Sequence, residues 1–296
     1  MSPCNLCPRM CGAFRDRGER GACGADNRMI IARAALHFWE EPPLSGEAGS
    51  GAVFFSHCPL HCIYCQNAEL AAGLAGAEVP TERLAEVCLE LQDQGALNVN
   101  FVTPTHYSQT IRKAVDIARA GGLSIPIVWN TSSYERIEAI DSLRDTADIF
   151  LADFKYADES LAHAYSRAHD YPQVALEAIA KMIDVAGEPR LEEHGGQARM
   201  VSGVIVRHLV LPGAIENSKR ALAMLWAQFG DSVLYSIMNQ YTPLIEHPVL
   251  GRAVSAAEYE EVLDFADSLG IEDYFWQDAP TAQESFIPAW DGTGLS

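Results

Sequence analysis

Three cysteines within a span of eight positions are the residues of this sequence best suited to do chemistry. They are Cys58, Cys62 and Cys65, in the segment Cys58-Pro-Leu-His-Cys62-Ile-Tyr-Cys65. Thiolates hold iron–sulfur clusters, and a 4Fe–4S cluster normally takes four of them. No fourth cysteine lies nearby in the sequence, so a cluster here would leave one iron open for another ligand, as catalytic metal sites do. A zinc site completed by His57 or His61 is the alternative.

A second group of cysteines lies close to the N-terminus. Its members are Cys4, Cys7, Cys11 and Cys23. Four thiolates close a coordination shell, so this quartet predicts a structural metal or an auxiliary electron-carrying cluster. Zinc, a rubredoxin-like iron and an iron–sulfur cluster remain open, with zinc or iron favoured. Four arginines stand among these cysteines: Arg9, Arg15, Arg17 and Arg20. They are interpreted as support for a negatively charged cluster, as a solvated face or as a docking patch for an acidic electron donor.

Composition and charge restrict the class of protein. The 296 residues carry a formal charge of −19, which disfavours nucleic acid and anionic membrane surfaces as partners. No apolar run is long enough to span a membrane, and the first residues lack the pattern of a signal peptide. Grouped cysteines indicate metal binding in a reducing compartment, so we expect a cytoplasmic protein. Cys88 shares a helical face with Leu84, Val87 and Leu91, which predicts a core position.

Short apolar runs alternate with amphipathic ones from Gly51 onward. The strand-like runs are 52–56, 97–102, 125–129, 147–152, 199–210, 232–238 and 271–276. This alternation predicts βα units and an α/β fold, a partial (open) TIM-like barrel of about six parallel strands. We expect two domains, a Cys-rich lobe at 1–50 and the barrel at 51–296. Thr81 is a predicted N-cap, Ser255 with Glu258 a predicted capping box, and 187–198 a predicted exposed loop.

The cysteine triad also resembles the signature of a known superfamily. C-x3-C-x2-C with an aromatic residue, Tyr64, just before the last cysteine, at the end of a first barrel strand, resembles the radical S-adenosylmethionine (SAM) signature. The resemblance implies that the amino and carboxylate groups of SAM chelate the open iron. One electron then cleaves SAM to methionine and a 5′-deoxyadenosyl radical, which abstracts a hydrogen atom from the substrate.

Further phrases are similar to the iron–sulfur proteins related to pyruvate formate-lyase-activating enzyme, the glycyl-radical activases. The phrases are 4–11 (CNLCPRMC), 39–43 (WEEPP), 49–51 (GSG), 54–56 (FFS), 65–67 (CQN), 100–106 (NFVTPTH), 153–156 (DFKY), 207–213 (RHLVLPG) and 238–241 (MNQY). This resemblance implies an activase-like oxidoreductase acting on a protein glycine. It also implies an electron donor such as flavodoxin or ferredoxin.

Polar residues that follow the apolar runs are candidates to hold SAM. They are Tyr64, Thr105, His106, Asn130, Asp153, Lys155, Arg207 and Gln240. Ligands of α/β folds gather at the carboxyl ends of strands. The resemblance implies Lys155 for the SAM carboxylate and Asp153 for a ribose hydroxyl. Residues 103–106 lack the glutamate of the superfamily's Gly-Gly-Glu turn, so Thr105 or backbone carbonyls would meet the amino group.

Each of these assignments has a structural alternative. Asp153 and Lys155 also suit an internal ion pair, His106 a bond to loop backbone, and Tyr64 a core position. For function, two alternatives stand beside the activase hypothesis. One is radical SAM modification of a small metabolite or a peptide, and the other is a non-catalytic iron–sulfur electron carrier, which needs neither an open iron nor the polar strand ends.

Overall fold

A sheet of mostly parallel strands forms the centre of the molecule. The computed structural model describes residues 3–277 and 288–295. Within them the strand order is β10-β9-β8-β6-β5-β4-β2-β1-β3, and β7 pairs with β8 alone. The strands are β1 (Ile30–His37), β2 (Ser50–Phe55), β3 (Ala77–Glu78), β4 (Val99–Val102), β5 (Ile127–Thr131), β6 (Ile149–Asp153), β7 (Arg190–His194), β8 (Gln197–Leu209), β9 (Leu234–Met238) and β10 (Tyr274–Phe275).

The parallel part of the sheet runs from β2 to β10. Each neighbouring pair in this series is parallel, whereas β1 and β3 add an antiparallel edge beside β2. The strand order ends at β3 and β10, so the sheet of the described residues stays open. The predicted α/β fold with an open parallel barrel is therefore confirmed. Its cause is the repeated βα unit, because a strand must cross over through a helix to pair in parallel.

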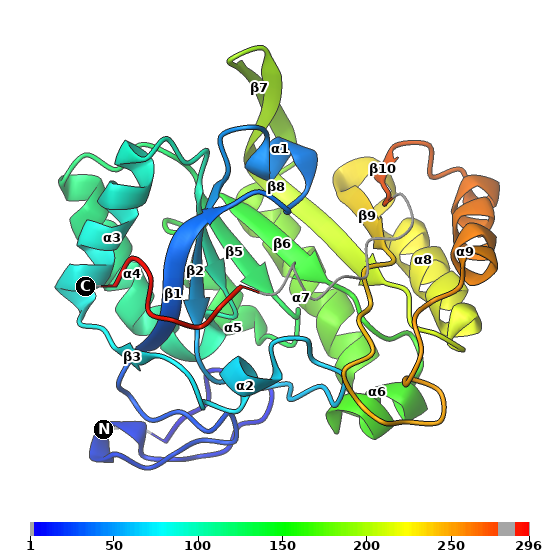
Figure 1. Ribbon diagram of the computed structural model, residues 1–296, viewed down its shortest axis with the longest axis horizontal. Helices are drawn as coiled ribbons and strands as arrows, with labels where there is room; N and C mark the ends of the chain where they lie inside the picture. The colour runs from blue at the N-terminus through cyan, green and yellow to red at the C-terminus, as the bar shows by residue number, and fades with distance from the viewer. Residues whose placement is uncertain (1–2, 278–287, 296) are drawn as a thin grey trace.

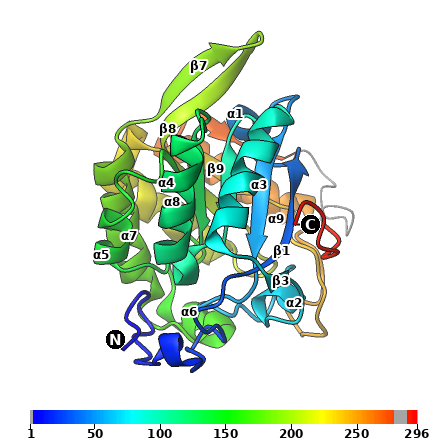
Figure 2. The same cartoon turned by 90° about the vertical axis from the view of Figure 1, so that its left-hand side faces the viewer.

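Helices cover the outer face of this sheet (Figures 1 and 2). Those that follow the parallel strands are α3 (Thr81–Asp93), α4 (Ser108–Ala120), α5 (Ile137–Asp141), α6 (Glu159–Ser166), α7 (Tyr171–Ala186), α8 (Ile215–Phe229) and α9 (Ala256–Leu269). The short helices are α1 (Pro42–Ser45), α2 (Ala68–Ala71) and the 3-10 turns Arg15–Arg17, Thr105–Tyr107 and Gly230–Ser232. Cys88 on α3 is fully buried in the core between helices and sheet, as predicted.

Alternation along the strands divides apolar from polar side chains. Phe101, Trp129 and Phe150 belong to the core that the helices share with the outer face of the sheet. Their neighbours in sequence point to the opposite, inner face, because side chains of a strand alternate between faces. Asn100 and Asn130 are two of these neighbours. The polar residues near the strand ends therefore line the inside of the open barrel.

The amino-terminal end of the inner face is closed by apolar residues. Leu44 of α1 packs with Val128, Leu151 and Ile205 in a separate buried cluster. Val128 and Asn130 are two positions apart on β5, and Leu151 and Asp153 are two apart on β6. The interior is thus apolar at the amino-terminal end of the strands and polar at the carboxyl-terminal end.

Two local expectations are corrected by the structure. Residues 187–198, predicted as a loop, include β7 and the start of β8, which form an exposed antiparallel hairpin that projects from the sheet (Figure 1). Every residue of β7 is exposed, so the hairpin has no apolar face that periodicity could reveal. Thr81 is the first residue of α3 rather than its cap, and Pro80 holds the cap position without a side-chain bond. The capping box of Ser255 and Glu258 is confirmed.

Both ends of the described chain pack beside the sheet. Of the range 1–50, predicted as a separate lobe, residues 30–37 form β1 and pair with β2. The C-terminal segment 288–295 crosses β1, where Ala34 donates a backbone bond to Thr293 and Trp290 lies 5.3 Å from the Phe54 ring (Figure 1). None of the described helices has the length and apolar character that a membrane span requires.

Candidate active site

One cavity of about 220 Å³ brings together most of the residues that the sequence singled out. Its lining includes nine of them: Cys58, Cys62, Tyr64, Cys65, Asn130, Asp153, Lys155, Arg207 and Gln240. They come from the loop after β2 and from the carboxyl ends of β5, β6, β8 and β9. Parallel strands present these ends at one edge of the sheet, which explains the convergence of segments far apart in the chain.

The loop after β2 carries the three cysteines into this cavity. All three are free thiols. Burial, reinforced by the neighbouring cysteines, raises the pKa of the Cys58 thiol to about 11 and that of Cys65 to about 12. His57 and His61 have positive φ angles of 75° and 52°, so the loop turns sharply on either side of Cys58. Thiols held together in a buried site become thiolates only when a positively charged partner compensates them.

The three cysteines supply the donors that an iron–sulfur cluster requires. Cluster thiolates bind different iron atoms and need not converge on one point. Asn67 also lines the cavity, and its Oδ1 is buried without a hydrogen-bond partner among the described residues. The three thiols can bind the iron atoms of a cluster, and the unpaired Asn67 Oδ1 can accept a hydrogen bond from a polar ligand in the same cavity.

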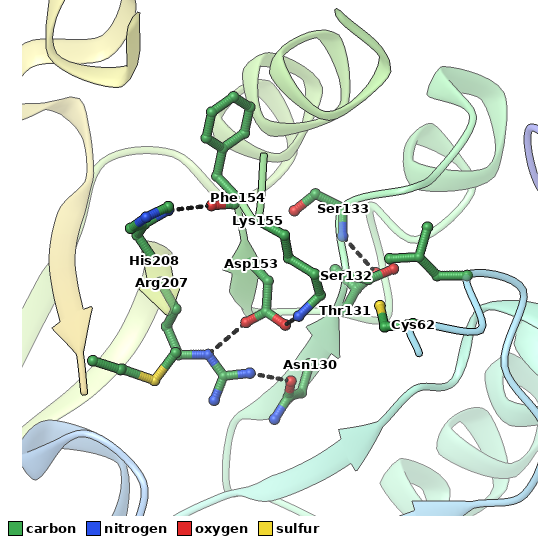
Figure 3. Close-up of polar contacts among 12 residues, drawn as sticks. Cys62, Asn130, Thr131, Ser132, Ser133, Asp153, Phe154, Lys155, Arg207 and His208 are labelled. Carbon is green, nitrogen blue, oxygen red and sulfur yellow. Dashed lines mark hydrogen bonds and ion pairs between the residues drawn. The ribbon is translucent and has the colours of Figure 1, made fainter. Parts of the chain in front are cut away.

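Opposite the cysteines stands a buried network of charged side chains (Figure 3). Lys155 Nζ lies 2.6 Å from Asp153 Oδ2, and Arg207 Nε lies 2.8 Å from Asp153 Oδ1. The same guanidinium donates to Asn130 Oδ1 at 2.7 Å and reaches Glu40 Oε2 at 3.2 Å. The ion pair that the sequence left open as an alternative is therefore present, on the cavity wall itself.

The charges of this network determine its protonation. Burial opposes ionisation of Asp153, yet the charges of Arg207 and Lys155 lower its pKa overall. Burial likewise opposes the charged form of Lys155, and Asp153 raises its pKa overall. For Glu40 burial dominates and raises the pKa despite Arg207. The site thus holds two cations beside one firmly ionised carboxylate, a set that binds a ligand carrying both a carboxylate and hydroxyl groups.

Thr105 and His106 lie outside the cavity lining, contrary to their predicted place at the cofactor. Thr105 donates to Glu135 Oε1 at 2.5 Å, and His106 Nε2 lies 2.8 Å from the Ser56 carbonyl oxygen. Thr103, with a positive φ of 59°, lines the cavity instead. After this turn, Thr105 and His106 lie outside the cavity lining, and burial lowers the pKa of His106 to about 3. His106 therefore has the backbone-bonded environment that was its alternative.

Several residues of the site carried no role in the sequence interpretation. Glu40 belongs to the phrase at 39–43, but its partners, the Asn130 amide on β5 and the Arg207 guanidinium on β8, lie 90 and 167 positions away. Glu135 is buried and accepts hydrogen bonds from Thr105 and Thr131. Ser166 donates to Cys62 Sγ at 3.1 Å. An acidic residue within an apolar stretch is the signal that points to buried carboxyls of this kind.

The N-terminal cysteines occupy a loop structure packed against the cysteine loop of the cavity. Cys7 and Cys23 are buried, Cys4 is half-buried and Cys11 is exposed. The lobe contacts the barrel through His61 Nε2, which lies 3.2 Å from the Ala22 carbonyl oxygen. Arg15, expected to lie on a solvated face or to support a cluster, is buried and donates to the His106 carbonyl oxygen at 2.6 Å.

Comparisons with known proteins agree with this geometry. Residues 52–190 match the family profile described as the radical SAM superfamily. An uncharacterised protein of Methanocaldococcus jannaschii is 25% identical over 281 residues, which cover 91% of this chain and 75% of that protein.

Solved structures support the fold. A radical SAM methyltransferase from Sphaerobacter thermophilus aligns with a TM-score of 0.54 and 14% identity over 77% of this chain and 66% of that one. Streptococcus suis SuiB bound to precursor peptide SuiA aligns with a TM-score of 0.55 and 12% identity over 76% of this chain and 47% of that one. This chain spans less than two thirds of either structure. The profile match assigns the segment 52–190, which carries the cysteine loop and the ends of β4 to β6, to the radical SAM superfamily, whose members use a 4Fe–4S cluster and SAM.

Proposed function

We propose that this protein is a radical SAM enzyme in which Cys58, Cys62 and Cys65 hold the 4Fe–4S cluster. The observation that carries the proposal is the meeting of three free thiols with the Asp153–Lys155–Arg207 network on one cavity. A cysteine loop alone suits many metal sites. Thiols facing a buried pair of cations and a carboxylate match a cluster whose open iron takes a zwitterionic ligand.

When bound, the cluster and SAM would supply a reductive cleavage: one electron from a donor of the flavodoxin or ferredoxin class enters, and the products are methionine, 5′-deoxyadenosine and a substrate lacking one hydrogen atom. The protein itself needs no general base for this reaction, because the substrate loses a hydrogen atom rather than a proton. Its residues must bind, orient and exclude water.

Different side chains of the cavity would bind the ligand, orient it and exclude water. The Lys155 ammonium can pair with a ligand carboxylate, and the Asp153 carboxylate can accept from ligand hydroxyls. Gln240 and Asn130 add amides to the wall. The Tyr64 ring closes one side and contacts Tyr156, Tyr165 and Tyr241 edge-on, with centroids 6.4, 6.0 and 6.1 Å away. This aromatic packing keeps water from the thiols.

For the substrate we propose a protein glycine, as in the glycyl-radical activases. The support is the set of phrases that resemble these enzymes, together with the rim of the cavity. Trp39 lines the cavity and is 61% exposed, so an apolar surface stands at its edge. An exposed tryptophan beside a polar cavity is typical of a surface that receives a polypeptide. The enzyme would act in the cytoplasm, without nucleic acid or membrane as a partner.

Modification of a small metabolite or a peptide is the second candidate. Glu40 and Arg207 place fixed charges on the cavity wall, and such convergent polar groups suit a small polar substrate. SuiB, whose structure contains a precursor peptide, has a similar fold. An assay that offers a glycyl-radical enzyme, peptides and metabolites in parallel separates the two candidates by which of them loses hydrogen.

We also propose that the protein divides into the Cys-rich lobe 1–50 and the barrel 51–296, and that Cys4, Cys7, Cys11 and Cys23 bind a second metal. Zinc, iron and an auxiliary cluster are the candidates. Burial raises the pKa of Cys7 and of Cys23, and the charge of Arg15 offsets only part of this rise at Cys23.

The central proposal is tested on anaerobically reconstituted protein. The protein is reduced with dithionite, SAM is added, and 5′-deoxyadenosine is quantified while the electron paramagnetic resonance (EPR) spectrum is recorded with and without SAM. We expect deoxyadenosine and a spectral shift in the wild type and neither in the variant with all three cysteines replaced by alanine. Cys88→Ala, which removes a buried thiol distant from the cavity, is the matched control and should keep both signals. A loaded cluster that ignores SAM would support the electron carrier instead.

A further inference from the structure

The hydroxyl of Ser166 contacts the middle cysteine of the triad. Ser166 is the last residue of α6, and its Oγ donates to Cys62 Sγ at 3.1 Å. Ser166 is 2% exposed, so water does not compete for this hydrogen bond. The two residues are 104 positions apart, and their meeting depends on how α6 packs against the cysteine loop.

The neighbours of Ser166 fix the direction of this hydrogen bond. Tyr156 Oη lies 2.7 Å from Ser166 Oγ, and the Tyr64 ring packs edge-on against the Tyr156 ring. A thiolate sulfur only accepts, so the serine proton points to Cys62 while the serine oxygen accepts from Tyr156. The hydroxyls of Tyr156 and Ser166 therefore form a directed chain that ends on the sulfur. Each donor in such a chain polarises the next.

Arg9 holds the two segments that this hydrogen bond joins. Its Nε donates to the Pro59 carbonyl oxygen at 3.0 Å, on the cysteine loop. Its Nη2 donates to the Ser166 carbonyl oxygen at 2.7 Å, and its Nη1 donates to that of Arg167. Arg9 lies between Cys7 and Cys11, so the N-terminal lobe supplies the clamp between α6 and the cysteine loop. A backbone bond of 2.8 Å from Ile63 N to the Tyr165 carbonyl oxygen adds to it.

A hydrogen bond to a ligating sulfur affects the cluster electronically. Reduction adds negative charge that is shared with the thiolates, and a donor aimed at a thiolate stabilises that charge. Hydrogen bonds to the sulfurs are among the properties that set the reduction potential of iron–sulfur clusters. In a buried site the effect is larger than in water because the local dielectric is low.

We propose that Ser166 is a positioning and tuning residue whose hydroxyl, directed by Tyr156 and held in place by Arg9, raises the reduction potential of the cluster bound at Cys62. This inference rests on the proposed function, in which Cys62 is a cluster ligand. It assigns the N-terminal lobe a part in the reaction through Arg9, independent of any metal at its own cysteines.

The test is a potentiometric titration of the reconstituted protein, followed by EPR without SAM. Ser166→Ala should shift the midpoint potential to a more negative value at unchanged iron content. Tyr156→Phe should shift the potential in the same direction but by less. The Ser166 hydroxyl remains in this variant and only loses the hydrogen bond from Tyr156 that orients it. Ser160→Ala, at the exposed start of the same helix, is the matched control for serine. Tyr274→Phe on β10, which removes a hydroxyl that donates to Asp267 at the surface, is the control for tyrosine. Both controls should keep the wild-type potential.

The outcomes separate this inference from the proposed function. An unchanged or more positive potential in Ser166→Ala, with a full cluster, overturns the tuning role and leaves the radical SAM assignment intact. If Ser166→Ala cannot retain its cluster, Tyr156→Phe decides in the same way. A wild-type protein that binds no cluster refutes the proposed function itself. Ser166→Thr keeps a hydroxyl and should restore the wild-type potential, which a merely structural role of the serine would not predict.

Discussion

The Asp153 carboxylate on β6 and the Arg207 guanidinium on β8 face each other directly across two hydrogen-bonded strands, with 2.8 Å between Oδ1 and Nε. Both side chains point to the inner face of the sheet, where Lys155 contacts Asp153 (Figure 3). Glu40 contacts Arg207 from the other side. Buried charges of this kind are costly unless each has a partner. The site therefore depends on all four members.

Loss of Arg207 should destabilise the fold. Arg207→Met leaves Glu40 without its cation and Asp153 with Lys155 alone. We expect the free energy of unfolding to fall by about 3 kcal/mol, the lower end for breaking a buried pair. Urea denaturation measures it. Arg144→Met, which breaks exposed ion pairs with Asp141 and Asp184, is the control and should change little. Equal losses in both variants would contradict the buried role of Arg207.

Loss of Lys155 should weaken SAM binding. Lys155→Met removes the ammonium proposed to meet the ligand carboxylate, and a charge-assisted hydrogen bond contributes about 1.5–3 kcal/mol. We expect the dissociation constant for SAM to rise about 10- to 100-fold by isothermal titration calorimetry on the reconstituted protein. Lys181→Met, at an exposed ion pair on α7, is the matched control and should bind as the wild type does. An unchanged constant in Lys155→Met would refute the proposed contact between Lys155 and the SAM carboxylate.

The buried His208 should make stability depend on pH. Burial lowers its pKa from 6.5 to about 4, and both ring nitrogens are bonded, to the Phe154 carbonyl oxygen and to Ser218 Oγ. Below pH 6.5 the unfolded chain binds a proton at this residue, whereas His208 in the folded chain stays neutral until the pH approaches about 4. Stability is therefore lost as pH falls from 6.5 towards about 4, by up to about 1.4 kcal/mol per pH unit.

Urea denaturation at a series of pH values measures this dependence. His208→Gln lacks the titrating group, so its free energy of unfolding should fall less steeply over the same range. His163→Gln, at an exposed position on α6, should keep the wild-type slope. Parallel curves for the wild type and His208→Gln would show that His208 does not contribute to the dependence.

The N-terminal cysteines should bind metal independently of the triad. We expect the protein to contain zinc or iron beyond the four irons of one cluster, because four thiolates complete a coordination shell. Elemental analysis of Cys4→Ser and Cys7→Ser should show the loss of this metal and a retained EPR signal of the triad cluster. The triple cysteine variant is the converse control and should keep the second metal. Identical metal contents in the wild type and in the Cys4→Ser and Cys7→Ser variants would refute the second site.

The parallel fold could be predicted from the sequence alone, and the proposed chemistry of the cysteine loop rests on the sequence as well. Alternating apolar and amphipathic runs leave little choice but βα units, and these bring polar residues that follow different strands to one edge. Asn130, Asp153 and Arg207 could thus be predicted together without any knowledge of their contacts. The spacing of Cys58, Cys62 and Cys65 is local, so it survives any arrangement of the rest of the chain.

The distant residues that complete the site could be identified only once the chain was folded. The contacts of Glu40 with Arg207 and of Ser166 with Cys62 join segments 167 and 104 positions apart. Thr105 and His106 follow a strand as the other candidates do, yet after the left-handed turn at Thr103 they lie outside the cavity lining. Such contacts depend on the path of loops between elements, and that path follows from packing of the whole chain rather than from the local periodicity and spacing that a sequence displays.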